Sequence, residues 1–181
     1  MKLIFGANGK LGTDFKELFD SIGEKYIATD KNEVDITNGD FLRAYIKTMH
    51  QNYKIDTIIN CAAYNDVDKA QNDNKTFLLN EKAPQKLVEF AKKINAIFVT
   101  YSTDFVFDGK KREPYTEEDI PNPLSEYGKS KANGEKLVLE NYEKSYVIRT
   151  SWLFGIAGNN FNKQVINWSK NKDILKIADD F

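Results

Sequence analysis

The chain has 181 residues, 41% of them hydrophobic, so it is long enough to bury one sizeable core and short for two full domains. Its 26 basic and 27 acidic residues nearly cancel, which excludes the strongly charged surface that binds nucleic acid or an anionic membrane. The one cysteine cannot form an intramolecular disulfide, and the N-terminus carries no apolar leader. We therefore expect a cytoplasmic protein whose partners are small molecules or other proteins.

Short apolar runs alternate with longer amphipathic stretches along the chain, which is the pattern of βαβ units in a parallel sheet. The predicted strands are 2–5, 25–29, 57–60, 96–102, 146–149 and 174–177. The predicted helices are 11–22, 41–49, 77–94, 127–139 and 161–168. Residues 106–125 hold three of the four prolines and are predicted to form an ordered surface loop. The expected fold class is α/β, a Rossmann-type doubly wound parallel sheet.

A glycine-rich segment, GANGKLG at residues 6–12, follows the first predicted strand and opens the first predicted helix. Glycines at Gly6, Gly9 and Gly12 permit a tight turn and a close approach of the backbone to a pyrophosphate. The N-terminus of the following helix presents free N–H groups to the phosphates, and Gly9, Lys10 and Leu11 should line them. The alternative is an ordinary strand-to-helix turn, but the context favours a site for NADPH or NADH.

The second predicted strand runs into Asp30, about twenty residues beyond this segment. A carboxylate at this place typically accepts hydrogen bonds from the adenosine ribose, which favours NADH. Lys31 follows directly and could pair with a 2′-phosphate, so the choice between NADH and NADPH is left open. Asp35 and Ile36 are expected to lie against the adenine.

Hydroxyl and carboxylate side chains gather at the end of the fourth predicted strand, and a later helix carries Tyr127 and Lys131. Residues four apart share a helix face, so the Lys131 ammonium can lie near the Tyr127 phenol and lower its pKa. Tyr127 would then donate a proton to a carbonyl oxygen that Thr103 also binds. The Tyr127/Lys131 pair and the hydroxyl at the strand end are each weak evidence alone. Their combination with the glycine-rich turn indicates hydride transfer to a carbonyl.

Three longer stretches of the sequence resemble one protein family. NCAAYNDVDKA at 60–70, YSTDFVFDG at 101–109 and RTSWLFG at 149–155 resemble the dTDP-4-dehydrorhamnose reductases, a branch of the extended short-chain dehydrogenase/reductases. The resemblance implies cofactor contacts from Ala63, Tyr64, Asn65, Tyr101, Tyr127 and Lys131, catalysis by Thr103, Tyr127 and Lys131, and sugar-nucleotide contacts from Thr103, Asp104 and Trp152. It implies reduction of dTDP-4-dehydro-L-rhamnose to dTDP-L-rhamnose with NADPH or NADH, for dTDP-rhamnose biosynthesis and cell-surface polysaccharide.

The resemblance also implies a smaller C-terminal substrate domain. We expect residues 1–181 to form the NAD(P)-binding Rossmann domain, with 150–181 beginning the substrate side, most of the second domain missing, and the chain alone inactive. Tyr64 departs from the smaller polar residue or histidine expected at its position. No metal motif is found, although some relatives are associated with Mg²⁺, and a homodimer is left open.

Two other functions compete with the reductase. Related epimerases and dehydratases share the glycine turn and the Tyr/Lys pair, but Thr103 and Asp104 are followed by Phe105, so the acid pair that eliminates water is incomplete. A non-catalytic regulatory subunit, such as that of methionine adenosyltransferase, also resembles this branch. His50 is expected at the surface, and Cys61 as a small buried apolar side chain.

Overall fold

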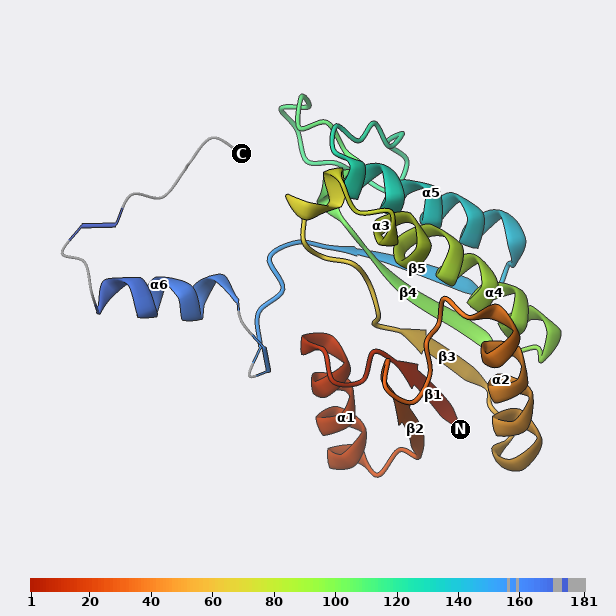
Figure 1. The fold of residues 1–181 in the computed structure, drawn as a ribbon. Coiled ribbons are helices and arrows are strands. Elements are labelled where there is room, and N and C mark those ends of the chain that lie inside the picture. The colour runs from red at the N-terminus through yellow and green to blue at the C-terminus, as the bar shows by residue number, and fades with distance from the viewer. Residues whose placement is uncertain (156, 159, 171–173, 176–181) are drawn as a thin grey trace.

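A parallel sheet forms the centre of the chain in a computed structural model that describes residues 1–155, 157–158, 160–170 and 174–175. Within these residues the strands are β1 (Lys2–Phe5), β2 (Tyr26–Thr29), β3 (Thr57–Asn60), β4 (Ile97–Thr103) and β5 (Ser145–Thr150). Their order is β2-β1-β3-β4-β5, and every neighbouring pair is parallel (Figure 1). The predicted α/β class is confirmed. The strand predicted at 174–177 lies largely outside the described residues, and 174–175 form no strand.

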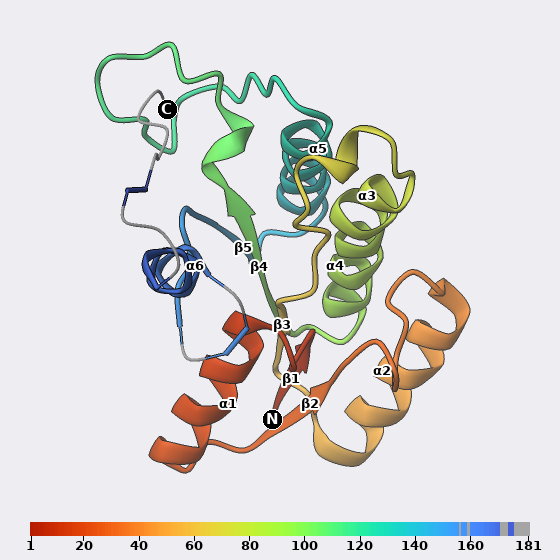
Figure 2. The same cartoon turned by 60° about the vertical axis from the view of Figure 1, so that its left-hand side comes forward.

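Helices cover both faces of the sheet, as a doubly wound fold requires. The longer helices are α1 (Lys10–Ile22), α2 (Gly39–Tyr53), α4 (Ala83–Lys93), α5 (Glu126–Asn141) and α6 (Phe161–Ser169). Figure 2 shows α1 and α6 on one side of the sheet and α2, α4 and α5 on the other. The order in which strands are added to the sheet therefore reverses at β1, which lies between β2 and β3. In such sheets the crevice beyond the carboxyl ends of the strands at this point is the usual ligand site.

The strands are apolar on both sides because both faces are covered. Successive side chains of a strand point to opposite faces. Leu3 and Phe5 thus join the larger core under α2, α4 and α5, whereas Ile4 joins the smaller core under α1. Ile58 and Ile59 of β3 divide in the same way. This burial explains why the sequence shows short continuous apolar runs in place of polar alternation.

The helix predicted at 77–94 is one continuous helical segment with an irregular start. It consists of α3 (Lys75–Phe77), a π-helical stretch η2 (Leu78–Lys82) and α4. Pro84 has no N–H, so it cannot donate the regular helical hydrogen bond to the Asn80 carbonyl. A Cβ on Gly134 of α5 would lie 2.1 Å from that carbonyl oxygen. The glycine therefore lets α5 pass close to the widened turn.

Two short 3₁₀ helices, η1 (Lys69–Gln71) and η3 (Asp104–Val106), complete the regular structure of the described residues. Among these residues, none of the helices combines the length and apolar character needed to cross a lipid bilayer.

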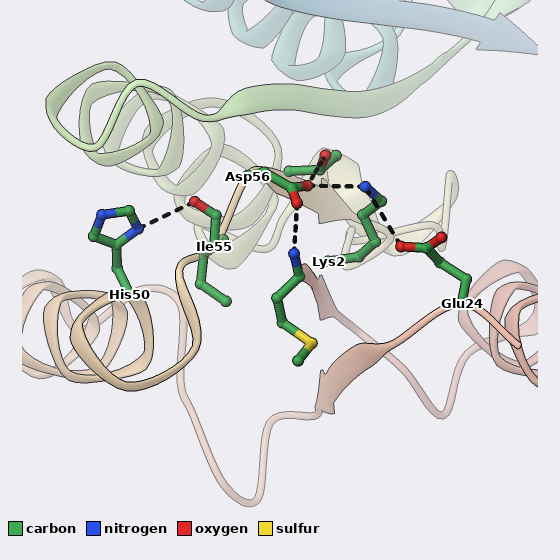
Figure 3. Close-up of polar contacts among 7 residues, drawn as sticks. Lys2, Glu24, His50, Ile55 and Asp56 are labelled. Atoms are coloured by element: carbon green, nitrogen blue, oxygen red, sulfur yellow. Dashed lines mark hydrogen bonds and ion pairs between the residues drawn. The ribbon is translucent and has the colours of Figure 1, made fainter.

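The amino ends of the strands carry a group of charged side chains (Figure 3). Lys2 Nζ donates to Asp56 Oδ1 at 2.9 Å and lies 3.6 Å from Glu24 Oε1. Partial burial acts to raise the pKa of Asp56, but hydrogen bonds from the N-terminal ammonium, Lys2 and Thr57 bring it below its usual value. His50, expected at the surface, is half-buried, and its Nδ1 lies 3.1 Å from the Ile55 carbonyl oxygen. These contacts join strands and helix at the edge opposite the glycine-rich turn.

Candidate dinucleotide and active site

The glycine-rich turn lies at the carboxyl end of β1, in the crevice where the sheet changes direction. Gly6 has φ 73°, and a Cβ on it would meet the Ala62 backbone nitrogen at 2.6 Å. A Cβ on Gly12 would lie 2.4 Å from the Gly6 carbonyl oxygen. Gly9 is the N-cap of α1 and provides no side-chain cap, so the N–H groups at Lys10 and Leu11 begin the helix without one. A turn of this geometry leaves its backbone open to a pyrophosphate, and the phosphate site stays a prediction.

Asp30 follows β2 and lies beside this turn. Asn8 N donates to Asp30 Oδ2 at 2.8 Å, and Lys31 N donates to Asp30 Oδ1 at 2.6 Å. The carboxylate that would bind the adenosine ribose is therefore tied to the segment that would bind the phosphates. Such a fixed spacing suits the ribose and pyrophosphate of one dinucleotide.

The two residues expected near the adenine differ in their surroundings. Asp35 Oδ1 accepts hydrogen bonds from Thr37 N at 2.9 Å and Thr37 Oγ1 at 2.7 Å, and these bonds lower the pKa of Asp35. Ile36 is 5% exposed and belongs to the larger core. Its side chain thus lies inside the protein, which leaves its backbone as the part able to face an adenine.

The segment after β3 passes between the turn and α5. Ala63 and Tyr64 are half-buried, whereas Asn65 is exposed. Asn80 holds this segment: its Oδ1 accepts from Tyr64 N at 2.8 Å, and its Nδ2 donates to the Tyr64 carbonyl at 3.0 Å and to Ser130 Oγ at 3.1 Å. No local sequence pattern marks Asn80, because its partners lie sixteen and fifty positions away.

The predicted catalytic residues all lie at the carboxyl end of β4 and the start of α5. Thr103 ends β4, while Tyr127 and Lys131 occupy successive turns of α5, and the three are 6%, 8% and 8% exposed. Lys131 Nζ donates to the Tyr101 carbonyl oxygen at 2.6 Å, which fixes the ammonium against β4. The Tyr127 ring meets Phe105 edge to face, with centroids 5.7 Å apart.

The charges of this cluster depend mainly on burial. Burial lowers the pKa of Lys131 to about 8, although the charge of Glu135 opposes the fall. Burial also raises the pKa of Tyr127; the Thr103 hydroxyl lowers it, and the Asp104 charge raises it further. The net direction is upward, whereas the sequence predicted a lowering by Lys131. The difference arises because desolvation of the phenol outweighs the neighbouring polar groups.

Asp104 connects the end of β4 to the segment after β5. Thr103 Oγ1 donates to Asp104 Oδ1 at 2.8 Å, and Ser151 Oγ donates to Asp104 Oδ2 at 2.7 Å. Trp152 follows with φ 53°, is 58% exposed, and its ring lies edge to face with Phe161 at 5.1 Å. The three residues expected to contact sugar nucleotide, Thr103, Asp104 and Trp152, thus lie at the same edge of the sheet.

No sequence pattern pointed to two further side chains of the site, Glu135 and Arg149. Glu135, one helical turn beyond Lys131, accepts hydrogen bonds from Arg149 Nε at 3.0 Å and Nη2 at 2.7 Å. The Arg149 guanidinium also lies 4.9 Å from the Phe107 ring centre. The spacing of four from Lys131 to Glu135 was visible in the sequence, but the partner of Glu135 on β5, Arg149, was not. Among the described residues, no three His, Cys, Asp or Glu side chains gather in a way that could hold a metal ion.

The model of the RmlD substrate binding domain family matches residues 1–181. The chain belongs to this family. A dTDP-4-dehydrorhamnose reductase of Aggregatibacter actinomycetemcomitans is 43% identical over 98% of this chain and 60% of its own length. One of Escherichia coli is 32% identical, again over 98% of this chain and 60% of its own length. The chain thus spans about 60% of the curated relatives it matches.

Solved structures of the family agree with the fold. A dTDP-4-dehydrorhamnose reductase of Clostridium acetobutylicum superposes with a TM-score of 0.92 at 40% identity, covering 99% of this chain and 63% of the other. The Bacillus anthracis reductase, solved in complex with NADP, gives a TM-score of 0.86 at 35% identity, covering 95% and 60%. The resemblance predicted from the three strings is therefore confirmed.

Proposed function

We propose that this chain provides the dinucleotide-binding and catalytic part of a reductase that converts dTDP-4-dehydro-L-rhamnose to dTDP-L-rhamnose with NADPH or NADH. The observation that carries the proposal is the meeting of Thr103, Tyr127 and Lys131 at the sheet edge that also holds the glycine-rich turn. Relatives that match nearly the whole chain carry the name dTDP-4-dehydrorhamnose reductase, which supports the substrate.

The roles of the three residues follow from their surroundings. The nicotinamide of a bound cofactor would supply the hydride that reduces the carbonyl carbon. Tyr127 keeps its proton at neutral pH because burial raises its pKa, so the phenol is the proton donor to the carbonyl oxygen. The Lys131 ammonium and the Thr103 hydroxyl then stabilise the phenolate that remains.

We assign the substrate side to residues from 150 onward, with Asp104 and Trp152 toward the sugar nucleotide. The hydrogen bond from Ser151 to Asp104 supports this, because it joins that segment to the catalytic strand. Ala63, Tyr64, Asn65 and Tyr101 would border the cofactor. We also propose that the protein acts in the cytoplasm, consistent with a single cysteine that has no intramolecular disulfide partner.

The test is consumption of NADPH or NADH by the full-length protein in the presence of dTDP-4-dehydro-L-rhamnose, followed by absorbance. Tyr127→Phe removes the proton donor, so we expect loss of turnover by at least about a hundredfold with unchanged cofactor binding. Tyr53→Phe is the matched control, since Tyr53 is 49% exposed at the end of α2 and should keep full activity. Cofactor binding without turnover in the unmodified full-length protein would instead indicate a non-catalytic binding subunit.

A further inference from the structure

Two backbone N–H groups after the end of β2 and one in the glycine-rich turn beside it all donate to carboxylates of the chain itself. Asn8 N and Lys31 N donate to the two oxygens of Asp30, at 2.8 and 2.6 Å. Asp30 N donates to Glu33 Oε2 at 2.8 Å. The backbone turns sharply here, since Glu33 N and Val34 N both donate to the Asp30 carbonyl, and this turn brings the Glu33 carboxylate back over the strand end. The two carboxylates therefore accept hydrogen bonds from the consecutive N–H groups of Asp30 and Lys31.

The end of β2 matters for the choice of cofactor, because NADH and NADPH differ only in a phosphate on the adenosine 2′-oxygen. A ribose hydroxyl can donate a hydrogen bond to a carboxylate, whereas a 2′-phosphate needs hydrogen-bond donors and cations. At this strand end the three backbone donors are already used by Asp30 and Glu33. A phosphate would have to displace a carboxylate or lie against it, and both arrangements cost binding energy.

The nearby lysines do not offset this arrangement. Lys31 is exposed, and its charge acts on Asp35, where it contributes to the lowered pKa of that carboxyl. Lys16 Nζ donates to the Asn8 side chain at 3.3 Å, and Lys86 Nζ donates to the Thr37 carbonyl at 3.2 Å. Each lysine is a single point charge, without the planar fork with which arginine holds a phosphate.

We propose that Asp30 and Glu33 together reject the adenosine 2′-phosphate, so that this chain binds NADH in preference to NADPH. The inference rests on the proposed dinucleotide site and adds a specificity to it. Asp30 accepts the ribose hydroxyl, and Glu33 both occupies the Asp30 N–H and adds the second negative charge. The related Bacillus anthracis reductase was solved in complex with NADP, so a member of this family binds the phosphorylated cofactor.

The experiment is titration of the protein with NADH and, separately, with NADPH, measuring dissociation constants by calorimetry at low ionic strength. The unmodified protein should bind NADH at least about tenfold more tightly, which corresponds to 1.4 kcal/mol. Glu33→Gln should tighten NADPH binding about threefold or more and leave NADH binding within about twofold, because an exposed charge is removed. This gain should shrink as salt is added.

Glu24→Gln is the matched control, since it removes the same charge at the opposite edge of the sheet, beside Lys2 (Figure 3). It should change neither dissociation constant. Thermal unfolding of each variant identifies one that has failed to fold, and the comparison of the two cofactors on the unmodified protein needs no variant.

The outcomes separate the two proposals. Equal or tighter binding of NADPH overturns the specificity and leaves the reductase standing. Binding of neither cofactor removes the dinucleotide site and the specificity with it. A preference for NADH that Glu33→Gln does not weaken assigns the rejection to Asp30 alone and overturns the role of Glu33.

Discussion

Burial of Lys131 should make the stability of this protein rise with pH, and Lys131→Met should abolish that rise. Lys131 is only 8% exposed, and this burial lowers its pKa from 10.5 to about 8. In the unfolded chain the ammonium keeps its proton up to about pH 10.5. Between these values the unfolded state binds more protons than the folded state, so the free energy of unfolding increases with pH.

The size of the effect follows from the same numbers. Below about pH 8 both states are protonated, and the folded state bears the full cost of burying the cation. At 1.36 kcal/mol per unit, the fall to about 8 corresponds to roughly 3 kcal/mol, recovered as pH rises toward 10.5. The raised pKa of Tyr127 acts in the opposite sense, because above about pH 10 the unfolded state loses its phenolic proton first. The effect of Lys131 is therefore best measured between about pH 8 and pH 10, where it should raise the free energy of unfolding by roughly 2 kcal/mol.

The assay is urea unfolding of both proteins at steps from pH 7 to pH 10, with the free energy of unfolding obtained by linear extrapolation. The difference between the unmodified protein and Lys131→Met should change by about 2 kcal/mol across the window. Lys129→Met is the control, because Lys129 is 49% exposed on the same helix and pairs with Glu126 at the surface. Parallel stability curves for the unmodified protein and Lys131→Met would refute the reasoning.

Two other predictions concern groups outside the cluster of Thr103, Tyr127 and Lys131. Arg149→Met leaves the Glu135 carboxylate buried without its partner and should lower the free energy of unfolding by about 2–4 kcal/mol, whereas Lys136→Met, which breaks an exposed pair, should stay within about 0.5 kcal/mol. Urea unfolding measures both, and equal effects would contradict the argument. Burial raises the pKa of Cys61 to about 12, so its native-state reaction with a disulfide reagent at pH 8 should be at least about a hundredfold slower than in urea. Similar rates in both states would show an accessible thiolate.

Much of the fold could be predicted because its signals are local. The apolar runs at β1 and β3 are readable because both faces of those strands are buried. The glycine-rich turn is readable because steric contacts at Gly6 and Gly12 exclude a side chain. The spacing of Tyr127 and Lys131 is readable because helix geometry alone sets which residues share a face.

The surroundings of the site were not readable in the same way. Asn80, which joins the segment after β3 to α5, is an ordinary helical asparagine until Tyr64 and Ser130 are placed beside it. The π-helical stretch in which it lies is approached closely by Gly134 of a different helix, and the sequence does not show that approach. Sequence spacing predicts which residues share an element, but it does not predict which elements meet.

The protonation of the side chains in the site likewise depends on which elements meet in the tertiary structure. By itself the sequence determined the fold class, the place of the glycine-rich turn and the membership of the Thr103, Tyr127 and Lys131 cluster. Only the tertiary structure decided that the pKa of Tyr127 rises, that Lys131 lies against the Tyr101 carbonyl, and that Glu33 folds back onto Asp30. The reason is physical: desolvation and hydrogen bonding depend on the atoms that surround a group in space, and those atoms come from strands and turns far apart in the chain.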